Sequence, residues 1–154
     1  MNIADLLAER AVTTHVKSHT KEDVIRDLVG LRVQAGSIKE KDVSRLVQIL
    51  LKRESLGSTG IGQGVAIPHG KSDCVTQLVG AFGVSETGVD FDSLDGEPVH
   101  LFFILIAPQN STGTHLKILA KISRLLKDKF FRQALRESKS PEEVLKQIQD
   151  ENEY

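Results

Sequence analysis

The sequence predicts a single α/β domain, a layered sandwich in which helices flank a small mixed β-sheet. Residues 99–107, VHLFFILIA, are apolar on both alternating faces, which is typical of a central strand covered on both sides. Residues 39–54 carry apolar side chains at the i, i+3, i+4, i+7 spacing of an amphipathic helix. A chain of 154 residues is long enough for a core of two or three layers. We expect residues 1–150 to form this domain and residues 151–154 to form a short acidic tail.

The first third of the chain predicts one strand and three helices. Helical spacing of apolar residues within 3–7 predicts a short amphipathic helix, and residues 11–16 are typical of a strand. The next helix should begin after Thr20, whose hydroxyl can cap it, and end at Gly36. Its inward-facing side chains are expected to be Val24, Leu28, Leu31 and Ala35. Those of the helix over 39–54 are expected to be Val43, Leu46, Val47, Leu50 and Leu51.

Strands and turns dominate the middle of the chain. Residues 65–67 predict a short strand, and residues 78–84 alternate loosely and predict another. Residues 85–88, SETG, are typical of a turn. Residues 91–98 should form a loop with a tight turn at Asp95–Gly96, after which the central strand begins.

Three helices are predicted after the central strand. The first should run from about His115, with Thr112 or Thr114 as its N-cap. Its inward-facing residues are expected to be Leu116, Leu119, Ile122 and Leu126. The second helix should contain Phe130, Phe131, Ala134 and Leu135. The start signal of the last helix consists of Ser140, Pro141 and Glu143.

Composition excludes several classes of protein. The net charge of −1 gives no overall basic field, so we expect no nucleic-acid partner. The first ten residues lack the pattern of a signal peptide, and the longest apolar run, Leu101–Ala107, is too short to span a bilayer. We therefore expect no membrane insertion. The single cysteine, Cys74, excludes an intrachain disulfide and suits a reducing compartment, so a cytoplasmic location is expected.

The glycine-rich stretch 57–72, GSTGIGQGVAIPHGKS, is the candidate functional segment. It holds five of the twelve glycines in the chain. Pro68 has no N–H with which to continue a strand ladder, so the strand at 65–67 should stop there. His69 would then lie at a strand end, between a rigid proline and the flexible Gly70. This is a suitable position for an imidazole that meets a partner's reactive group.

Several common sites do not fit this stretch. A phosphate-binding Walker loop needs four residues between its glycines, but five residues, including a proline, separate Gly64 from Gly70. The dinucleotide motif G-x-G-x-x-G is also absent, as is the G-x-S-x-G of serine hydrolases. His69 and His115 without a third ligand make a poor metal site, because zinc requires four ligands, and the pair of His69 and Cys74 is a weak signal by itself. We expect neither a metal nor a cofactor.

The five histidines divide into two groups. His100 lies within the central strand and is expected to be structural, and His15 and His19 are expected to be solvated. His69 and His115 instead fall at element ends, where α/β folds assemble their sites. The alternative for His115 is that it simply occupies a first helical turn.

Phosphoryl transfer to His69 fits these residues best. The reaction needs a neutral imidazole nitrogen as nucleophile and hydrogen-bond donors around three charged oxygens. Arg53, the hydroxyls of Ser58 and Thr59, and the N-terminus of the His115 helix could supply those donors. The alternative for Ser58 and Thr59 is an ordinary turn. Lys71 is expected to be a solvated charge, the alternative being a contact with phosphate or a partner.

The residues also carry a family resemblance. Residues 53–71, RESLGSTGIGQGVAIPHGK, and residues 113–128, GTHLKILAKISRLLKD, resemble the type-2 (fructose/mannitol) enzyme IIA domains of the bacterial phosphotransferase system, in particular the nitrogen-regulatory branch, IIA-Ntr. The resemblance covers essentially the whole chain. It implies that His69 is the phosphoryl acceptor, that His115 is the second active-site histidine, and that Arg53 is the active-site arginine.

The resemblance implies a donor and leaves two functions open. The donor would be HPr or an HPr-like phosphocarrier protein. In the nitrogen branch, the phosphorylation state would regulate target proteins; in the transport branches, the phosphoryl group would pass to a IIB domain during fructose or mannitol uptake. Either way, the chain would be a phosphotransferase-system component, formally a transferase. Ile61, Val65 and Ile67 flank the loop, and we expect some of them to be exposed to partners, the alternative being that all three are core.

Overall fold

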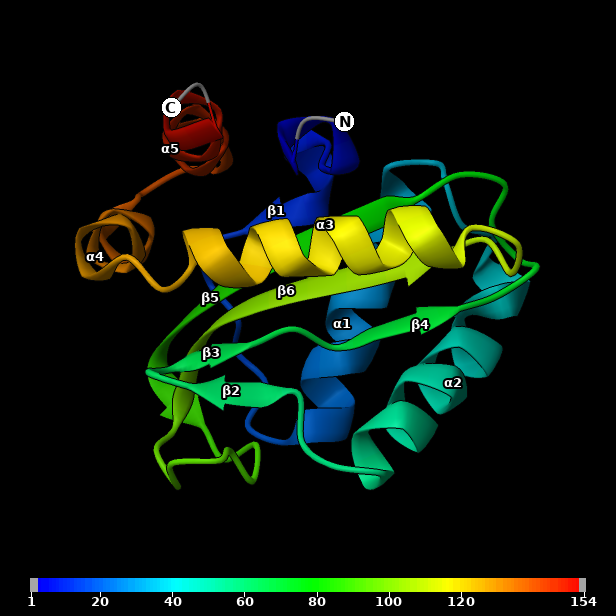
Figure 1. Ribbon diagram of the computed structural model, residues 1–154, viewed down its shortest axis with the longest axis horizontal. Helices are drawn as coiled ribbons and strands as arrows, with labels where there is room; N and C mark the ends of the chain where they lie inside the picture. Colours follow the sequence, from blue (N-terminus) through cyan, green and yellow to red (C-terminus); the bar gives the residue numbers. More distant parts are fainter. Residues whose placement is uncertain (1–2, 153–154) are drawn as a thin grey trace.

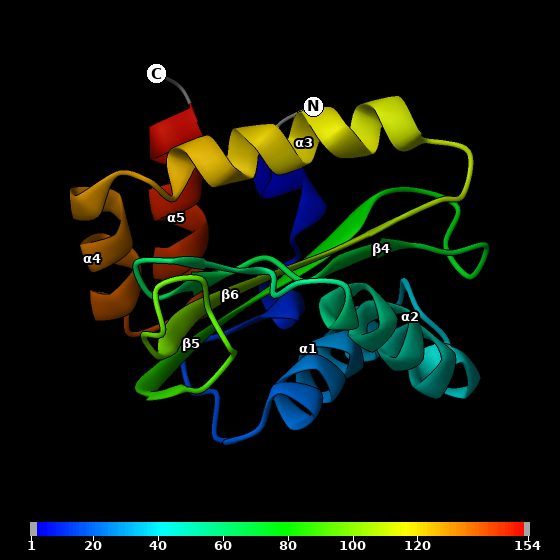
Figure 2. The same cartoon turned by 60° about the horizontal axis from the view of Figure 1, so that its bottom comes forward.

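The computed structural model describes residues 3–152 as three layers, with a sheet between two layers of helices (Figure 1, Figure 2). The sheet has six strands in the order β1-β5-β6-β3-β2, with β4 also paired to β6. The strands are β1 (Val12–Thr13), β2 (Gly60–Gly62), β3 (Val65–Ala66), β4 (His69–Lys71), β5 (Val79–Val89) and β6 (Val99–Ala107). The α-helices are α1 (Lys21–Gln34), α2 (Val43–Ser55), α3 (Thr112–Leu125), α4 (Lys129–Glu137) and α5 (Pro141–Asn152). The 3₁₀ helices are η1 (Ile3–Leu6), η2 (Glu9–Ala11) and η3 (Glu40–Asp42). The predicted fold class is confirmed.

Strand β6 is the centre of the sheet, as its sequence predicts. It pairs antiparallel with β5 on one side and parallel with β3 and β4 on the other. Its side chains alternate between two cores, because successive residues of a strand point to opposite faces. Leu101, Phe103 and Leu105 enter the core under α3, whereas Phe102, Ile104 and Ile106 enter the core over α1 and α2.

The helices cover the two faces of the sheet unequally. In Figure 2, α1 and α2 lie on one side of the sheet and α3 lies on the other, with α5 and the N-terminal segment. Burial of these two apolar faces is the main stabilising term of such a layered fold. Within residues 3–152, no helix combines the length and the apolar character needed to cross a bilayer.

The predicted helix caps at Thr20 and Ser140 are confirmed. Thr20 Oγ1 accepts the Asp23 N–H at 3.2 Å, and Ser140 Oγ accepts the Glu143 N–H at 3.2 Å. Gly36 follows the end of α1 with φ of +92°, a conformation that glycine adopts at little cost.

Several predicted boundaries were wrong. The strand predicted over 11–16 is reduced to β1, and the opening helix is a pair of short 3₁₀ turns. Strand β5 continues through the predicted turn at 85–88, where the register with β6 shifts between Val84 and Val89. The irregularity accommodates turn-forming residues without ending the strand. Helix α5 extends to Asn152, into the predicted tail, whose last two residues lie outside the described residues.

The inward face of α3 was predicted correctly at Leu119, Ile122 and Leu126, but incorrectly at Leu116, and the predicted N-cap was also wrong. The helix begins at Thr112, with Ser111 as its N-cap, and turns His115, Ile118 and Ile122 toward the sheet. Leu116, expected to point inward, is 61% exposed. The apolar spacing alone favoured leucine over histidine for the buried row, whereas the structure buries the histidine.

Candidate functional site

The segment between β3 and β4 brings His69 to the sheet in an unexpected way. The strand pauses at Ile67 and Pro68 and then resumes as β4, starting at His69. The predicted strand does end before Pro68, at Ala66, but the sequence did not predict that pairing resumes at His69. Proline lacks only the N–H; its carbonyl still accepts the Leu105 N–H at 2.9 Å, so pairing with β6 continues beyond it.

Strand alternation decides which way His69 faces. Val65 and Ile67 enter the core under α3, and His69 continues the same alternation. Gly70 faces the other way, toward α2, where an added Cβ would lie 2.9 Å from Ile49 Cγ2. The glycine after His69 is therefore required by close packing of α2 against β4.

The ring of His69 is held by its own backbone. Nδ1 lies 2.8 Å from the carbonyl oxygen of Ile67, to which it can only donate. This bond orients the ring and leaves Nε2 as the nitrogen with a free lone pair. Burial lowers the pKa of His69 below its ordinary value, opposed by the Ile67 hydrogen bond, and the charge of Arg53 lowers it further. The ring is accordingly neutral at pH 7.

His115 reaches the same place from the first turn of α3. Its ring centroid lies 5.6 Å from that of His69, with an interplanar angle of 74°. The residue is only 6% exposed, and within the described chain its Nε2 has no hydrogen-bond partner. Burial, together with His69 and Lys71, lowers the pKa of His115 to about 4. The structure thus places two neutral imidazoles together, from segments that are distant in sequence.

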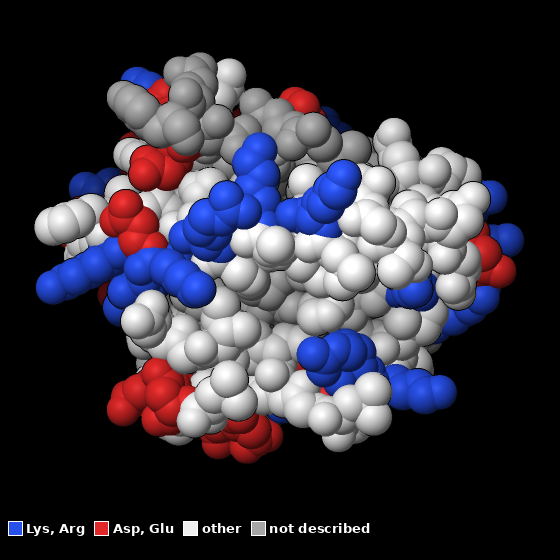
Figure 3. Space-filling view, viewed as in Figure 1, with Lys and Arg blue, Asp and Glu red and all other residues white. Residues whose placement is uncertain are grey.

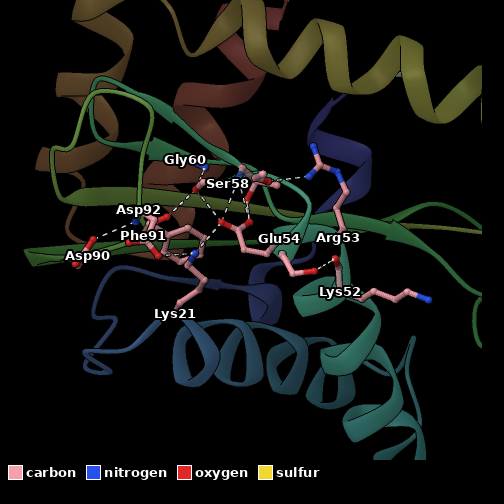
Figure 4. A network of polar contacts seen from close by, with 12 residues as sticks. Lys21, Lys52, Arg53, Glu54, Ser58, Gly60, Asp90, Phe91 and Asp92 are labelled. Atoms are coloured by element: carbon pink, nitrogen blue, oxygen red, sulfur yellow. Dashed lines mark hydrogen bonds and ion pairs between the residues drawn. The ribbon is translucent and has the colours of Figure 1, made fainter.

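Arg53 lies in the last turn of α2, near enough for its charge to act on His69. Its Nη1 donates to the Gly57 carbonyl at 2.8 Å, which turns the guanidinium back over the start of the glycine-rich stretch. Figure 4 shows the side chains of Arg53 and Glu54 pointing in different directions from this turn. Among the described residues Arg53 makes no ion pair, so its charge is available to a ligand.

Ser58 and Thr59 are occupied by a different group. Both Thr59 N–H and Thr59 Oγ1 donate to the carboxylate of Glu54, and Ser58 Oγ lies 2.8 Å from Glu54 Oε1. Thr59 is only 4% exposed. In this arrangement their hydroxyls hold the loop to α2, which differs from the phosphate-binding role predicted for them.

Glu54 is the residue that sequence reasoning missed. It is 6% exposed, and Lys21 of α1 lies 3.1 Å from its Oε1 while also standing over the Phe91 ring (Figure 4). Burial alone would raise the pKa of Glu54, but hydrogen bonds from Thr59, Ser58 and Lys21 outweigh it and lower the pKa. The sequence did carry a signal, because Glu54 continues the apolar row of α2 four residues after Leu50.

The remaining candidates have structural positions. Lys71 Nζ donates to Thr112 Oγ1 at 2.9 Å and ties β4 to the start of α3, so it is not simply solvated. His100 Nδ1 bonds the Ser85 carbonyl at 2.9 Å, and His15 and His19 are exposed; both predictions are confirmed. Within residues 3–152, no group of three or more His, Cys, Asp or Glu side chains is placed to hold a metal ion.

Comparison with known sequences identifies relatives of two kinds. The family described as phosphoenolpyruvate-dependent sugar phosphotransferase system, EIIA 2, matches residues 5–151. The nitrogen regulatory protein of Bradyrhizobium diazoefficiens is 37% identical over 94% of this chain and 92% of its own length. The fructose-specific EIIABC component of Bacillus subtilis is 38% identical over 94% of this chain, but the match spans only 22% of that protein.

Solved structures agree with this assignment. The nitrogen regulatory protein IIA-Ntr of Neisseria meningitidis is 38% identical, with a TM-score of 0.85 and coverage of 95% of this chain and 98% of that one. The enzyme IIA of the Escherichia coli mannitol system, solved in complex with its phosphorylated enzyme IIB, is 26% identical, with a TM-score of 0.76 and coverage of 92% and 96%. Since the family match spans almost the whole chain, this protein belongs to the EIIA 2 family of the phosphoenolpyruvate-dependent sugar phosphotransferase system.

Proposed function

We propose that this chain is a histidine phosphocarrier that accepts a phosphoryl group on Nε2 of His69 from a phosphorylated HPr-like protein. The observation that carries the assignment is the bond from Nδ1 to the Ile67 carbonyl at 2.8 Å. Since the proton is held on Nδ1, Nε2 keeps the lone pair that a nucleophile needs. The lowered pKa of His69 keeps that lone pair available at neutral pH.

The transfer can be written with its bonds and charges balanced. Nε2 of His69 forms a bond to phosphorus as the bond between phosphorus and the donor's histidine nitrogen breaks, and the bonding pair returns to the donor ring. The proton on Nδ1 stays in place, so the phosphorylated ring of His69 is cationic. The Ile67 carbonyl oxygen, which accepts that proton in a hydrogen bond, stabilises the positive ring.

Arg53 and His115 serve the phosphoryl oxygens in this proposal. Arg53 makes no ion pair within the described residues, so its guanidinium can offset the charge that moves with the phosphoryl group. His115 has an Nε2 that lacks a partner, and its neighbour in the site is His69 itself. The N–H groups in the first turn of α3 have no partner within the helix. They add hydrogen-bond donors that favour a negatively charged phosphoryl group.

We further propose that the phosphorylation state mainly regulates the binding of target proteins. The support is the degree of likeness: the IIA-Ntr structure matches with a TM-score of 0.85, against 0.76 for the mannitol enzyme IIA. Two apolar side chains next to site residues in sequence, Leu56 and Leu116, are 82% and 61% exposed. Of the three residues predicted to flank the site, Ile61 is 40% exposed, whereas Val65 and Ile67 are core.

A phosphoryl group would change this surface strongly. In Figure 3, an uncharged band lies between the basic side chains over α3 and those over the end of α2. Phosphorylation would place a phosphoryl group of about −1.5 to −2 charges there, offset in part by the cationic ring of His69. A partner that packs apolar surface on the unmodified site would have to desolvate that charge, which weakens its binding.

The test compares the two states against one captured partner. The protein is titrated unmodified and after treatment with a phosphorylated HPr-like donor, and His69→Ala receives the same treatment as a control. We expect the two states to differ by roughly 1–3 kcal/mol in binding free energy, and the control to show no difference. Equal affinities in both states would contradict the regulatory proposal.

The second candidate function is transport. It is favoured by the fructose-specific relative and by the mannitol enzyme IIA solved with its IIB partner. Rapid transfer from phosphorylated His69 to a IIB domain, together with equal affinities for regulatory targets, would favour this function.

A further inference from the structure

A pocket lies at the opposite end of the central strand from His69. It is formed by the start of β6, the turn between β2 and β3, and one face of α4, and its volume is about 280 Å³. The charged side chains that line it are Lys129, Arg132 and Arg136, and His100 lies beside them. Of the described residues that line this basic pocket, none is acidic. Figure 3 shows basic side chains gathered over α4 and the adjoining end of α3.

The guanidinium of Arg132 is held in place before any ligand binds. Its Nη1 donates to the carbonyl oxygens of Leu126 at 3.0 Å and Lys127 at 2.7 Å, where α3 ends. The C-terminal end of a helix favours a cation, which adds to the fixed position. Within residues 3–152, Arg132 makes no ion pair, so its positive charge is not neutralised by a carboxylate.

Arg136 and Lys129 are likewise without a counter-charge in the described chain. Nη2 of Arg136 lies 3.5 Å from Nδ1 of His100. Since the Ser85 carbonyl already receives the Nδ1 proton at 2.9 Å, Nδ1 has no lone pair to offer, and the two nitrogens are both donors. The contact is therefore not a hydrogen bond, and the guanidinium keeps its donors for a ligand.

We propose that this basic pocket binds a small oxyanion that carries at least two negative charges. Two guanidinium groups and an ammonium group facing one concavity match the oxygens of a phosphate or of a polycarboxylate. The volume lies at the lower limit of ligand pockets, roughly 300 Å³, which favours a small metabolite.

This pocket is separate from the phosphoryl site. The N–H of His100 bonds the Gly64 carbonyl, whereas His69 pairs with Leu105, five residues further along β6. At about 3.3 Å per residue, the two places are roughly 16 Å apart. At this distance a ligand in the basic pocket does not touch the phosphoryl group on His69, so its binding does not require phosphorylation. The two sites are nevertheless connected, because Gly64 and His69 belong to one continuous segment.

The test follows backbone amide signals of ¹⁵N-labelled protein during titration with pyrophosphate, inorganic phosphate or citrate at constant ionic strength. We expect saturating shifts at Gly64, His100, Leu101 and α4. Stronger binding of the phosphates than of citrate identifies a phosphate ligand, and the reverse order identifies a polycarboxylate. Failure of all three anions to saturate these signals by about 10 mM, an affinity too weak for a specific site, would overturn the proposal.

A matched pair of variants decides whether the pocket itself is responsible. Lys129→Gln combined with Arg136→Gln removes two exposed cations from the pocket, whereas Lys39→Gln combined with Lys41→Gln removes two exposed cations elsewhere. We expect the first pair to weaken binding by about tenfold or more and the second by less than about twofold. Equal weakening by both pairs would mean that net charge alone attracts the anion, and the proposal would fail. Thermal unfolding of each variant verifies that it is folded.

Discussion

His115 and the carboxylate of Glu54 are buried and His69 is half-buried, but the hydrogen bonding of Glu54 differs from that of the two histidines. Glu54 receives bonds from Thr59 and Ser58 and an ion pair from Lys21, so its charge is fully compensated. His115 has a ring nitrogen without a partner in the described chain, and its pKa falls to about 4. The comparison separates a region that holds the loop from a region whose groups are kept free for a reaction.

The difference has a physical basis. A buried charge must be paired to be tolerated, so a saturated carboxylate stabilises the loop that starts beside it. A nucleophile needs the opposite, because each hydrogen bond to its lone pair reduces its reactivity. We therefore expect substitutions in the Glu54 region to change stability and substitutions in the histidine region to change transfer.

The largest expected effect is that of Glu54→Ala. It leaves the Thr59 N–H and hydroxyl without their acceptor and removes one of the two carboxylates paired with Lys21, the other being Asp92. The free energy of unfolding should fall by about 3–4 kcal/mol. Urea denaturation measures it, with Glu40→Ala in the exposed η3 as a control that should change by less than about 0.5 kcal/mol. Unchanged stability together with abolished phosphoryl transfer would place Glu54 in the reacting region instead.

Arg53→Ala and His115→Ala should show the converse behaviour. Each removes a group that faces the moving phosphoryl group, and the transfer rate should fall about a hundredfold, or roughly 3 kcal/mol. Arg53→Lys keeps the charge but loses the planar fork, so it should also be slow. Rapid mixing with phosphorylated donor measures the rate. Wild-type rates in both alanine variants would leave His69 as the only residue of the site.

The two regions should also separate on acidification. A folded pKa of about 4 for His115, against an ordinary value of 6.5, means that the unfolded chain binds the proton more readily. Stability is therefore full above pH 6.5 and is lost as the pH falls toward 4, with a loss of about 2 kcal/mol by pH 4.5. The pKa of Glu54 is also lowered, so its contribution to stability is present above its ordinary value of 4.5 and is lost only as the pH falls below that value.

Denaturation of the wild type and of His115→Gln at pH 7 and pH 4.5 measures this effect. The variant should lose less stability than the wild type between the two values, because it lacks the titrating ring. Parallel losses in both proteins would mean that another group carries the pH dependence.

The smallest expected effects are those of Ser58→Ala and Thr59→Val. Each removes one hydrogen bond to Glu54, so stability should fall by about 1–2 kcal/mol, while transfer should change by less than about threefold. The same rate and denaturation measurements apply. A hundredfold slower transfer at unchanged stability would restore the phosphate-binding role that the sequence suggested for these hydroxyls.

The sequence predicted the layers of the fold and the central strand because apolar periodicity reports which faces are covered. It also singled out His69, His115 and Arg53, although only the structure brings the two histidine rings to 5.6 Å. The continuation of pairing beyond Pro68 could not be predicted, since it depends on a carbonyl bond from a distant strand. The role of Glu54 was missed because the partner that compensates its charge, Lys21, comes from another helix.

The phosphorylated ring nitrogen tests the central claim most directly. The protein is phosphorylated by an HPr-like donor, and ¹⁵N and ³¹P NMR locate the phosphoryl group on the ring. The bond from Nδ1 to the Ile67 carbonyl predicts one acid-labile phosphoryl group on Nε2 of His69, and none on His69→Ala. A phosphoryl group on Nδ1 of His69 or on His115, or full labelling of His69→Ala, would contradict the account.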